Sequence, residues 1–433
     1  MGTGLPQTTR ELHMDAPSTR PLHLPCPAPR LALALLALAS WASAAQPDWP
    51  QFHGPQRDAR SAETGLLKRW PAAGPKLLWT ARGIGHGFSS VAIAGELIYT
   101  TGNIGNDTVI TALGLDGTAR WQARNGPAYK RSYPGTRGTP TLDAGRLYHE
   151  NADGDVVCLE AATGKPLWSL NILKAFGGRN IRWALAESLL IDGDRLICTP
   201  GGKKAGIVAL DKMTGKTLWV CPDTGDEPGY ASPIVVDYKG IRQVITMMSR
   251  SVVGVHAETG RLLWKVKHAA AFNENIHTPV FHDGLVFVST LPPTAGQCIK
   301  LTVAGDQVSA ERLWRTGALN NHHGGVVLVD GYLYGSTTLG NWVCLDLKTG
   351  RKMHGARGVG KGSVVYADGM LITYSEKGRV GLVKATPEHH QVISQFRIPK
   401  GGKGPSWAHP VVCRGRLYLR HGDFLFCYDI RRQ

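Results

Sequence analysis

Short apolar runs separated by turn residues follow one another along most of the chain. The run from Thr278 to Phe287, T-P-V-F-H-D-G-L-V-F, has an apolar segment, an Asp-Gly pair and a second apolar segment. Asp-Gly is favoured in the tight turn of a β-hairpin, because glycine adopts a positive φ without strain. Comparable runs occupy 90–99, 139–148, 188–197, 232–236, 326–334, 363–372 and 409–418. The pattern predicts many short strands joined by tight turns.

A second hairpin motif carries a heavy aromatic residue at a fixed distance past its turn. It reads A-L-D-K-M-T-G-K-T-L-W at 209–219, and it recurs at 159–168, 255–264 and 345–354, with a shortened copy at 115–121. Aligning the copies of this motif with the ends of the remaining strands of the same kind places eight residues in one column: Trp79, Trp121, Trp168, Trp219, Trp264, Trp314, His354 and Phe396. Members recur about every 40 to 50 residues, which is the length of a propeller blade. We expect this column on the outermost strands, where it can pack against a neighbouring blade.

These repeats predict an all-β fold, an eight-bladed β-propeller of four-stranded antiparallel blades over residues 76–433. Residues 406–433 supply only three strands for the last blade. The missing strand is available at Lys76–Trp79. We therefore expect the N-terminal strand to close the ring, which removes the open sheet edges.

Residues 1–44 have the features of a signal peptide. Arg20 and Arg30 precede the apolar run L-A-L-A-L-L-A-L, and Ala42-Ser43-Ala44 follows as an A-x-A cleavage signal. The apolar run is too short to span a bilayer. We predict a periplasmic or secreted protein without a transmembrane segment after cleavage, with either Met1 or Met14 as the start. Residues 45–75, rich in Pro, Gly and polar residues, should form an irregular segment laid over the propeller.

The net charge of +16 favours anionic partners, such as anionic envelope polymers or envelope proteins. Export argues against nucleic acid. The alternative is a diffusely basic, solvated surface, because no dense Lys/Arg run is present. Cys158, Cys344 and Cys427 share one repeat position and should be small buried hydrophobic residues. Two further pairs could form disulfides within single blades: Cys198 with Cys221, and Cys413 with Cys427.

The motif T-G-[KR]-x-x-W after an L-D step resembles the pyrroloquinoline quinone (PQQ)-type repeat. The resemblance covers residues 76–433. That family includes quinoprotein alcohol dehydrogenases and the outer-membrane assembly factor BamB. The resemblance implies either a catalytic or a non-catalytic propeller, since one fold hosts several functions. Quinoprotein dehydrogenases hold PQQ over a calcium ion, and many carry two adjacent cysteines in a disulfide that stacks on PQQ. This chain has no adjacent cysteine pair.

Candidate site residues come from the starts of the innermost strands, which should point at the central channel. Aligning the openings gives Ser89, Thr139, Glu187, Ser232, Thr278, Gly325, Ser363 and His409. Further polar residues lie close by in sequence: Arg137, Arg182, Asn275, His277, Asn321, His322, His323, Lys361 and Trp407. Glu187 is the single carboxylate of the column, and a carboxylate with amide oxygens suits calcium. The alternative is that these residues satisfy strand ends and hold channel water.

Two functions remain open. The favoured one is a monomeric, non-catalytic binding or scaffold protein of the cell envelope, without a cofactor. The alternative is a PQQ- and calcium-dependent alcohol or sugar dehydrogenase, with Glu187 as the calcium ligand. No residue is assigned a catalytic role. In either case the buried carboxylate of Glu187 needs compensation, by calcium, by Arg137 or Arg182, or by a proton.

Overall fold

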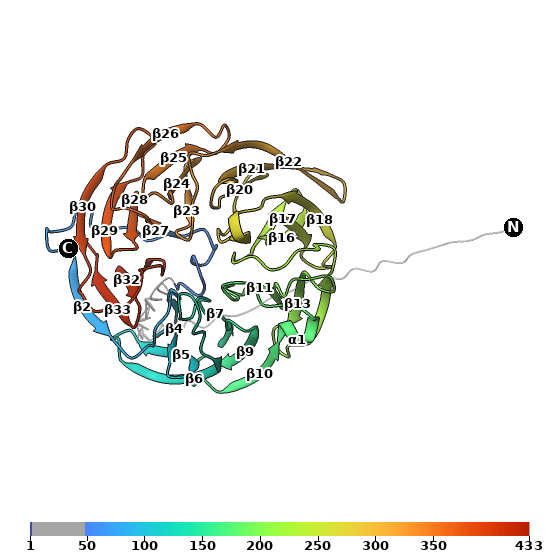
Figure 1. The fold of residues 1–433 in the computed structure, drawn as a ribbon, viewed down its shortest axis with the longest axis horizontal. Coiled ribbons are helices and arrows are strands. Elements are labelled where there is room, and N and C mark those ends of the chain that lie inside the picture. Colours follow the sequence, from blue (N-terminus) through green and yellow to red (C-terminus); the bar gives the residue numbers. More distant parts are fainter. Residues whose placement is uncertain (2–47, 433) are drawn as a thin grey trace, which may run out of the picture. The chain divides into compact units, whose positions relative to one another are not determined.

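The predicted eight-bladed propeller is confirmed. The computed structural model describes residues 1 and 48–432, and the expected signal peptide lies outside the described residues, apart from Met1. Eight blades, each of four antiparallel strands, are arranged around one central axis (Figure 1). Within each blade, strands that are consecutive in sequence are neighbours, apart from the last blade.

The blades follow one another in sequence. The first four comprise β3–β6 (Ala92–Ala94, Leu97–Ile104, Asp107–Gly114, Ala119–Pro127), β7–β10 (Thr141–Asp143, Arg146–Glu150, Asp155–Glu160, Pro166–Asn171), β11–β14 (Leu190–Asp192, Arg195–Cys198, Ile207–Asp211, Thr217–Cys221) and β15–β18 (Ile234–Tyr238, Ile241–Met247, Ser251–His256, Leu262–Lys267). The next three comprise β19–β22 (Val280–His282, Leu285–Val288, Gly296–Ala304, Gln307–Thr316), β23–β26 (Val326–Val329, Tyr332–Ser336, Trp342–Asp346, Lys352–Ala356) and β27–β30 (Gly362–Ala367, Met370–Ser375, Arg379–Lys384, Val392–Arg397).

The last blade joins the two ends of the propeller. It contains β31 (Val411–Cys413), β32 (Arg416–His421) and β33 (Phe424–Asp429), and its outermost strand is β2 (Lys76–Ala81). β2 runs antiparallel to β33, with Lys76 opposite Asp429 and Ala81 opposite Leu425. The predicted closure by an N-terminal strand is therefore confirmed.

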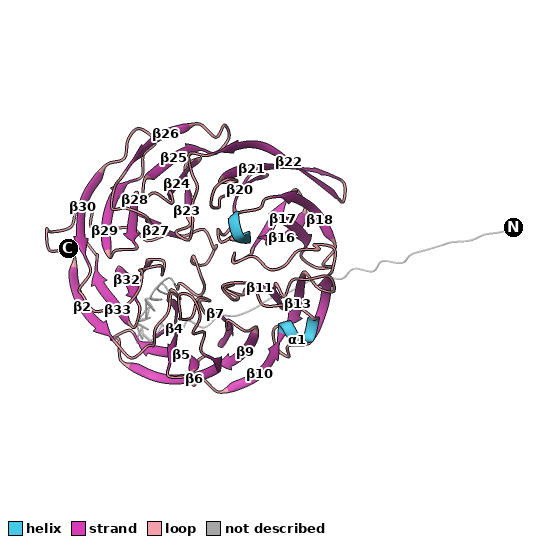
Figure 2. Ribbon diagram, viewed as in Figure 1, coloured by secondary structure: helices cyan, strands magenta, loops and turns pink. Residues whose placement is uncertain are grey.

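Helices are scarce among the described residues (Figure 2). The helix α1 (Ile172–Phe176) is capped by Asn171, whose side chain accepts a hydrogen bond from the backbone N–H of Lys174, and it ends at Gly177 with φ 67°. A short 3-10 helix, η1 (Ala271–Asn273), precedes the fifth blade. None of the helices in the described part of the chain is long and apolar enough to cross a membrane.

The tryptophan column joins neighbouring blades, as the sequence predicted. The indole of Trp219 on β14 donates a hydrogen bond to the carbonyl of Ala257 in the following blade, over 3.0 Å. Its ring also lies against Gly260, where an added Cβ would come within 2.4 Å of the ring. The same ring-to-glycine contact recurs in the pairs Trp79–Gly117, Trp121–Gly164, Trp168–Gly215 and Trp314–Gly350. The glycine of each turn thus makes room for the tryptophan of the preceding blade.

Two members of the column behave differently. Trp264 donates to the side chain of Gln243 in its own blade, over 2.7 Å. The assignment of Phe396 was wrong, because Ser394 occupies the equivalent position opposite Leu382. The turn before β30 is longer than the other turns, and this displaces the alignment by two residues. Trp70 from the N-terminal segment packs edge-on against Phe396, with ring centroids 5.3 Å apart.

The segment before β2 is more ordered than predicted. The short strand β1 (Arg60–Ser61) pairs in parallel with β27 and adds a fifth strand to that sheet. Trp49 forms an isolated bridge with Ile93 in the first blade. In Figure 1 the blue N-terminal segment enters the centre of the ring. Residues 48–75 therefore reach into the axis as well as across the blades.

The cysteines follow the main sequence expectation. Cys158, Cys344 and Cys427 are buried free thiols, as are Cys198 and Cys221. Both disulfide pairings considered from the sequence are therefore not formed. Burial raises the pKa of the Cys344 thiol to about 12, so it packs as a neutral, small apolar side chain.

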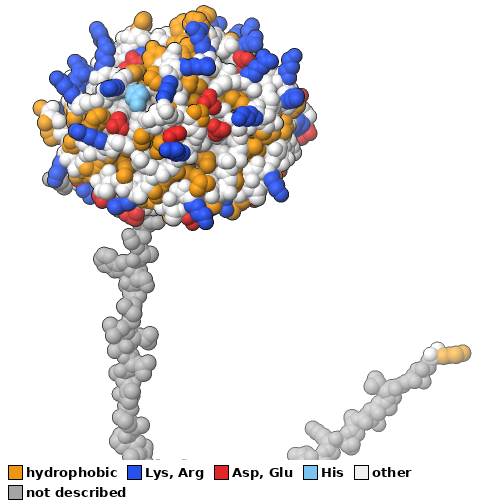
Figure 3. All heavy atoms as spheres, turned by 60° about the horizontal axis from the view of Figure 1, so that its bottom comes forward, with side chains coloured by type: hydrophobic (Ala, Val, Ile, Leu, Met, Phe, Trp, Pro, Cys, Tyr) orange, Lys and Arg blue, Asp and Glu red, His pale blue; other side chains and the backbone are white. Residues whose placement is uncertain are grey.

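Basic side chains do not gather into one patch on the face that Figure 3 shows. On the face drawn in Figure 3, Lys and Arg side chains are spread over the propeller with Asp and Glu between them. The excess positive charge of the chain is therefore distributed on this face, which is the arrangement expected of a solvated basic surface.

We expect Trp219→Ala to destabilise the fold by about 3–5 kcal/mol, because it removes a large buried ring at a blade contact. Trp219 is 8% exposed, whereas its neighbour Leu218 is 50% exposed. Leu218→Ala is therefore the matched control and should change stability by less than about 1 kcal/mol. Denaturant unfolding of both variants measures the difference. Equal stabilities would contradict the assignment of Trp219 to the blade contact.

Gly260→Ala tests the same contact from the opposite blade. The new methyl group would meet the ring of Trp219 at 2.4 Å, in addition to the strain of a φ of +71°. Gly240 has a comparable φ of +82° and no atom within 4 Å of the added Cβ, so Gly240→Ala carries the backbone strain alone. We expect the Gly260 variant to melt well below the Gly240 variant. A melting temperature at or above that of Gly240→Ala would show that the contact is unimportant.

Candidate functional site

A cavity of about 630 Å³ lies at the axis of the propeller. All eight blades contribute to it through the segments that precede their innermost strands, because these strands converge on the axis. The contributing residues include Phe88, Arg137, Trp183, Tyr230, His277, His323, Lys361 and Trp407. The volume falls within the range of about 300–1,000 Å³ that is usual for small-molecule sites.

The N-terminal segment builds one buried wall of this cavity. Phe52 and His53 both line it, and their rings are stacked with centroids 3.9 Å apart. The Nε2 atom of His53 lies 2.9 Å from Nδ1 of His409, and Nε2 of His409 lies 2.8 Å from the carbonyl of His323. Residues from the start and the end of the chain therefore meet at the axis.

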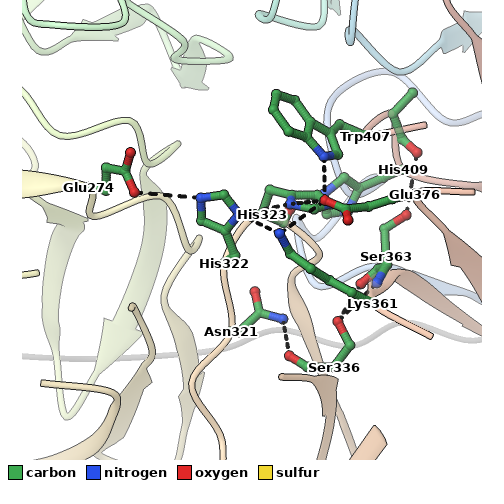
Figure 4. Close-up of polar contacts among 12 residues, drawn as sticks. Glu274, Asn321, His322, His323, Ser336, Lys361, Ser363, Glu376, Trp407 and His409 are labelled. Carbon is green, nitrogen blue, oxygen red and sulfur yellow. Dashed lines mark hydrogen bonds and ion pairs between the residues drawn. The ribbon is translucent and has the colours of Figure 1, made fainter. Parts of the chain in front are cut away.

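A chain of polar contacts runs along another wall (Figure 4). The indole of Trp407 donates to Oε1 of Glu376 over 2.7 Å, and Nζ of Lys361 lies 3.0 Å from the same oxygen. Lys361 also lies 2.9 Å from Nδ1 of His322. Nε2 of His322 is 3.6 Å from Oε2 of Glu274. Glu376 thus accepts hydrogen bonds from a cation and an indole at once.

Four of the imidazoles that line the cavity have lowered pKa values and are neutral near neutral pH. Burial lowers the pKa of His277 to about 3 and that of His409 to about 4, and it lowers the pKa values of His53 and His323 well below the usual range. His277 is 2% exposed, and neither of its ring nitrogens has a hydrogen-bond partner. Nε2 of His323 also lacks one. His277 and His323 line the cavity, but these three nitrogens are themselves buried within the protein.

Of the two arginines predicted near the axis, only Arg137 lines the cavity. Its guanidinium donates to the backbone carbonyls of Gly135 and Tyr133 and lies 4.4 Å from the ring centroid of Tyr129. Arg182 is exposed and stacks on the rings of Trp183 and Phe272 instead.

The two asparagines predicted for the site are buried but hold the blade loops. Asn275 donates to the carbonyls of Met248 and His268, and Asn321 donates to the carbonyl of Ser336. Neither lines the cavity. His277, His322, His323, Lys361, Trp407 and His409 are brought together there with Arg137.

The predicted axial position of Glu187 differs from its position in the structure. The hydroxyl column at the axis contains Ser90, Thr139, Ser188 and Ser232, each of the last three accepting a hydrogen bond from the backbone N–H of the preceding member over 3.0 Å. Glu187 is therefore one residue out of register, and a shift of one residue turns a side chain to the opposite face. Its Oε2 accepts from the backbone N–H of Thr199, away from the cavity lining.

The Glu187 carboxyl is compensated by a proton, as one of the predicted alternatives has it, and by Arg57, which the sequence did not indicate. Burial raises its pKa to about 7, although hydrogen bonds from Thr199 and the charge of Arg57 oppose the shift. Arg57 belongs to the N-terminal segment and donates to the carbonyls of Ser188 and Leu189 over 2.6 and 2.9 Å. Burial and the nearby Glu187 raise the pKa of Glu150 as well. Of the predicted alternatives, the raised pKa supports the proton, and the arginine near Glu187 is Arg57 instead of Arg137 or Arg182.

The oxygen donors at the axis do not fit a calcium ion. Calcium takes six to eight oxygens, whereas Glu187, Asn275 and Asn321 lie outside the cavity lining and Glu376 is engaged by Lys361 and Trp407. Within residues 48–432, no three His, Cys, Asp or Glu side chains are grouped so as to hold a metal ion.

Among the residues of the site that sequence reasoning missed are His53, Glu274 and Glu376. Glu376 lies in the turn between β28 and β29, so an alignment of innermost strands does not include it. Glu274 ends η1, in a loop without a repeat pattern. His53 belongs to the Pro- and Gly-rich segment 45–75, whose aromatic pair Phe52-His53 was the available signal.

We expect Glu187→Gln to stabilise the fold at alkaline pH. A carboxyl with a raised folded-state pKa loses stability as pH rises from about 4.5 through about 7. Gln imitates the protonated form, so the gain should be small at pH 5 and on the order of 2 kcal/mol at pH 8. Thermal unfolding at both pH values measures it, with the exposed Glu258→Gln as the control. A Glu187 variant less stable than wild type at pH 8 would contradict this account.

Comparison with known proteins supports the repeat assignment. A family model described as outer membrane protein assembly factor BamB matches residues 105–356. The BamB of Burkholderia pseudomallei is 23% identical over 317 residues, covering 62% of this chain and 76% of that protein.

Solved structures share the fold at low sequence identity. BamB from Moraxella catarrhalis superposes with a TM-score of 0.58 at 14% identity, covering 83% of this chain and 99% of that one. A quinohemoprotein alcohol dehydrogenase from Comamonas testosteroni superposes with a TM-score of 0.62 at 13% identity, covering 90% and 82%. The matched family model extends over more than half of the sequence. The chain therefore belongs to the PQQ-repeat propeller family described as outer membrane protein assembly factor BamB.

Proposed function

We propose that this chain is a non-catalytic binding or scaffold protein of the cell envelope, located in the periplasm. Family membership and the signal peptide that the sequence predicts for residues 1–44 support the location. The observation that carries the non-catalytic role is the state of the acid–base groups in the axial cavity. Four imidazoles of the cavity are neutral near neutral pH, and the carboxylate of Glu376 is bound by Lys361 and Trp407.

General acid–base catalysis works best with a group whose pKa lies near the working pH. The cavity imidazoles of His277 and His409 have pKa values lowered to about 3 and about 4, so they are weak bases near neutral pH. Glu376 is engaged by Lys361 and Trp407. The cavity is therefore suited to holding a molecule, and poorly suited to moving a proton.

The second candidate is a quinone-dependent alcohol or sugar dehydrogenase. It is supported by the fold shared with a quinohemoprotein alcohol dehydrogenase and by the size of the axial cavity. The oxygen donors near the axis argue against the calcium ion that such an enzyme would need. Glu187, Asn275 and Asn321 lie outside the cavity lining, and Glu376 is engaged by Lys361 and Trp407. We therefore derive no reaction step for this candidate.

The partners that we propose are envelope proteins or anionic envelope polymers, and not nucleic acid. Such polymers are repeatedly charged and would meet a basic chain of net charge +16. The last blade takes its fourth strand from this chain itself, which is consistent with the monomer that we propose.

Two measurements test this function together. Osmotic-shock fractionation of the native host should release the mature protein with the periplasm, and its N-terminus should begin at residue 45. The purified protein, with PQQ and calcium added, should reduce no dye in the presence of alcohols or sugars. PQQ-dependent dye reduction would overturn the non-catalytic role, and a cytoplasmic location would overturn the envelope assignment. Heat-denatured protein with the same additions is the control.

A further inference from the structure

We propose that the end of the propeller at which the axial cavity opens docks on an anionic lipid bilayer. Exposed apolar side chains of this end enter the headgroup region, and unpaired basic residues face the lipid phosphates. This inference rests on the proposed location in the cell envelope and adds the kind of surface that the protein meets there. It concerns the loops around the cavity, and no group inside the cavity takes part.

The propeller has two ends that are built from different loops. One end, the mouth end, is formed by the connections that lead into the innermost strands and by the loops between the second and third strands of each blade. The opposite end is formed by the turns between the first and second strands and between the third and fourth. Tyr133 lies in the connection between β6 and β7, lines the axial cavity and is 53% exposed. The cavity is therefore reached from the mouth end.

Acidic residues are placed regularly at the opposite end. The turn between the first and second strands carries an acidic residue in every blade except the last, as at Asp143 and Asp192. Basic residues nearby are paired with these carboxylates: Lys212 lies 2.7 Å from Asp143, and Arg242 lies 2.6 Å from Asp192. Much of the basic charge at this end is therefore offset within the protein.

Basic residues form an arc at the mouth end, from the last blade to the third. The connections into the second blade (128–140) and the last blade (398–410) contain basic residues and no acidic ones, and the connection into the third blade contains only the buried Glu187. The arc ends at the connection into the fourth blade, which carries acidic residues, Asp223 and Glu227 among them, and no basic one. Six exposed members of the arc form no ion pair with a carboxylate of residues 48–432: Arg131, Arg179, Arg182, Lys203, Lys204 and Lys403.

Two loops of this arc lie against each other. An added Cβ at Gly178, beside Arg179, would come within 2.5 Å of the carbonyl oxygen of Pro200. One at Gly177 would come within 3.5 Å of the side chain of Lys204. Like charges that are brought together in this way repel one another, and anions outside the protein relieve the repulsion. The arc therefore favours a surface that carries many negative groups.

Apolar side chains protrude at the same end. Phe272, which precedes the fifth blade, is 67% exposed, and Leu339, in the loop between β24 and β25, is 86% exposed. Together with Tyr133 they stand on separate loops around the opening, so they do not form one groove. Apolar tips distributed around an opening are suited to a flat apolar layer, such as the boundary between headgroups and acyl chains.

One of these tips has a cation beside it. The guanidinium of Arg182 lies 4.9 Å from the ring centroid of Phe272 and 4.7 Å from that of Trp183. An apolar body next to a charged group is typical of side chains at a membrane interface. A soluble anionic polymer would meet the cation and leave the rings in water. A bilayer offers phosphates and an apolar layer together, so it matches both features.

Vesicle co-sedimentation tests the proposal. The mature chain from residue 45 is used, because the apolar run before it would itself bind lipid. We expect vesicles with about 30% phosphatidylglycerol to bind at least about 10-fold more tightly than vesicles of phosphatidylcholine alone. Salt at about 1 M should remove most of this difference, because it screens the charges. No measurable binding to the anionic vesicles, or equal binding to both kinds, would overturn the proposal.

Charge variants test which end docks. Lys203→Gln combined with Lys204→Gln should weaken binding to the anionic vesicles at least about 5-fold, since each lysine close to an anionic surface contributes a factor of about five. Lys165→Gln combined with Lys216→Gln changes the net charge equally, but at exposed turns of the opposite end, and should leave binding unchanged. Replacement of Lys203 and Lys204 by arginine should also preserve binding. Equal losses in the two glutamine variants would overturn the assignment to the mouth end.

Apolar variants test the contact with lipid. Phe272→Ser combined with Leu339→Ser should weaken binding at least about 10-fold, because it removes two side chains that enter the bilayer. Leu218→Ser combined with Leu313→Ser is the matched control, since these exposed leucines lie on the outermost strands β14 and β22. This control should bind as the wild type does. Unchanged binding of the Phe272 and Leu339 variant would overturn the entry of apolar side chains into the bilayer.

Poly-L-glutamate distinguishes a bilayer from an acidic protein segment or polymer, because it is anionic and has no apolar layer. Added to the anionic vesicles at an equal number of charges, it should leave most of the protein bound to lipid. Displacement of most of the protein would overturn the lipid assignment. Failure to bind vesicles would leave the proposed function standing, because location and dye reduction are measured separately. A cytoplasmic location would overturn that function whatever the vesicles show.

Discussion

The pairing of β2 with β33 is the constraint on which the rest of the structure depends. The last blade has only three strands of its own, and the fourth comes from Lys76–Ala81 near the other end of the folded region. Only a closed ring brings all eight innermost strands to one axis. The segments before these strands then form a single cavity, so the site is a consequence of closure.

The N-terminal stretch 48–81 contributes to three parts of the molecule at once. It supplies the closing strand, it lines the cavity with Phe52 and His53, and it places Arg57 near Glu187. Elsewhere in the ring, the tryptophan-to-glycine contacts hold neighbouring blades together. Structure and site are therefore coupled through one segment, and changes in residues 48–81 should affect both.

The repeats made the fold predictable, because a strand motif that recurs at blade length carries its own register. The same repeats predicted that the tryptophans contact the next blade. The predicted register was wrong at Phe396, because the preceding turn is longer than in the other blades. It was also wrong at Glu187, where a shift of one residue turns the side chain away from the axis. Sequence alignment of strand openings cannot detect a shift of one residue, although that shift moved the carboxylate out of the axis.

The site was only partly predictable, since its charged centre does not lie on repeat positions. Arg137, His277, His323, Lys361 and His409 could be named because they stand close to strand openings. Glu376 and Glu274 lie in a turn and a loop, and they meet the other residues only through three-dimensional closure. The pairing of Glu376 with Lys361 is thus visible only in the folded chain.

Ring closure is tested most directly by comparing two truncated chains, residues 48–433 and residues 82–433, by size-exclusion chromatography with light scattering. The account predicts that the longer chain is a monomer with one sharp thermal transition. The shorter chain lacks β2, exposes the edge of β33 and should aggregate or oligomerise. A monomeric 82–433 chain with the melting temperature of the longer one would contradict the account.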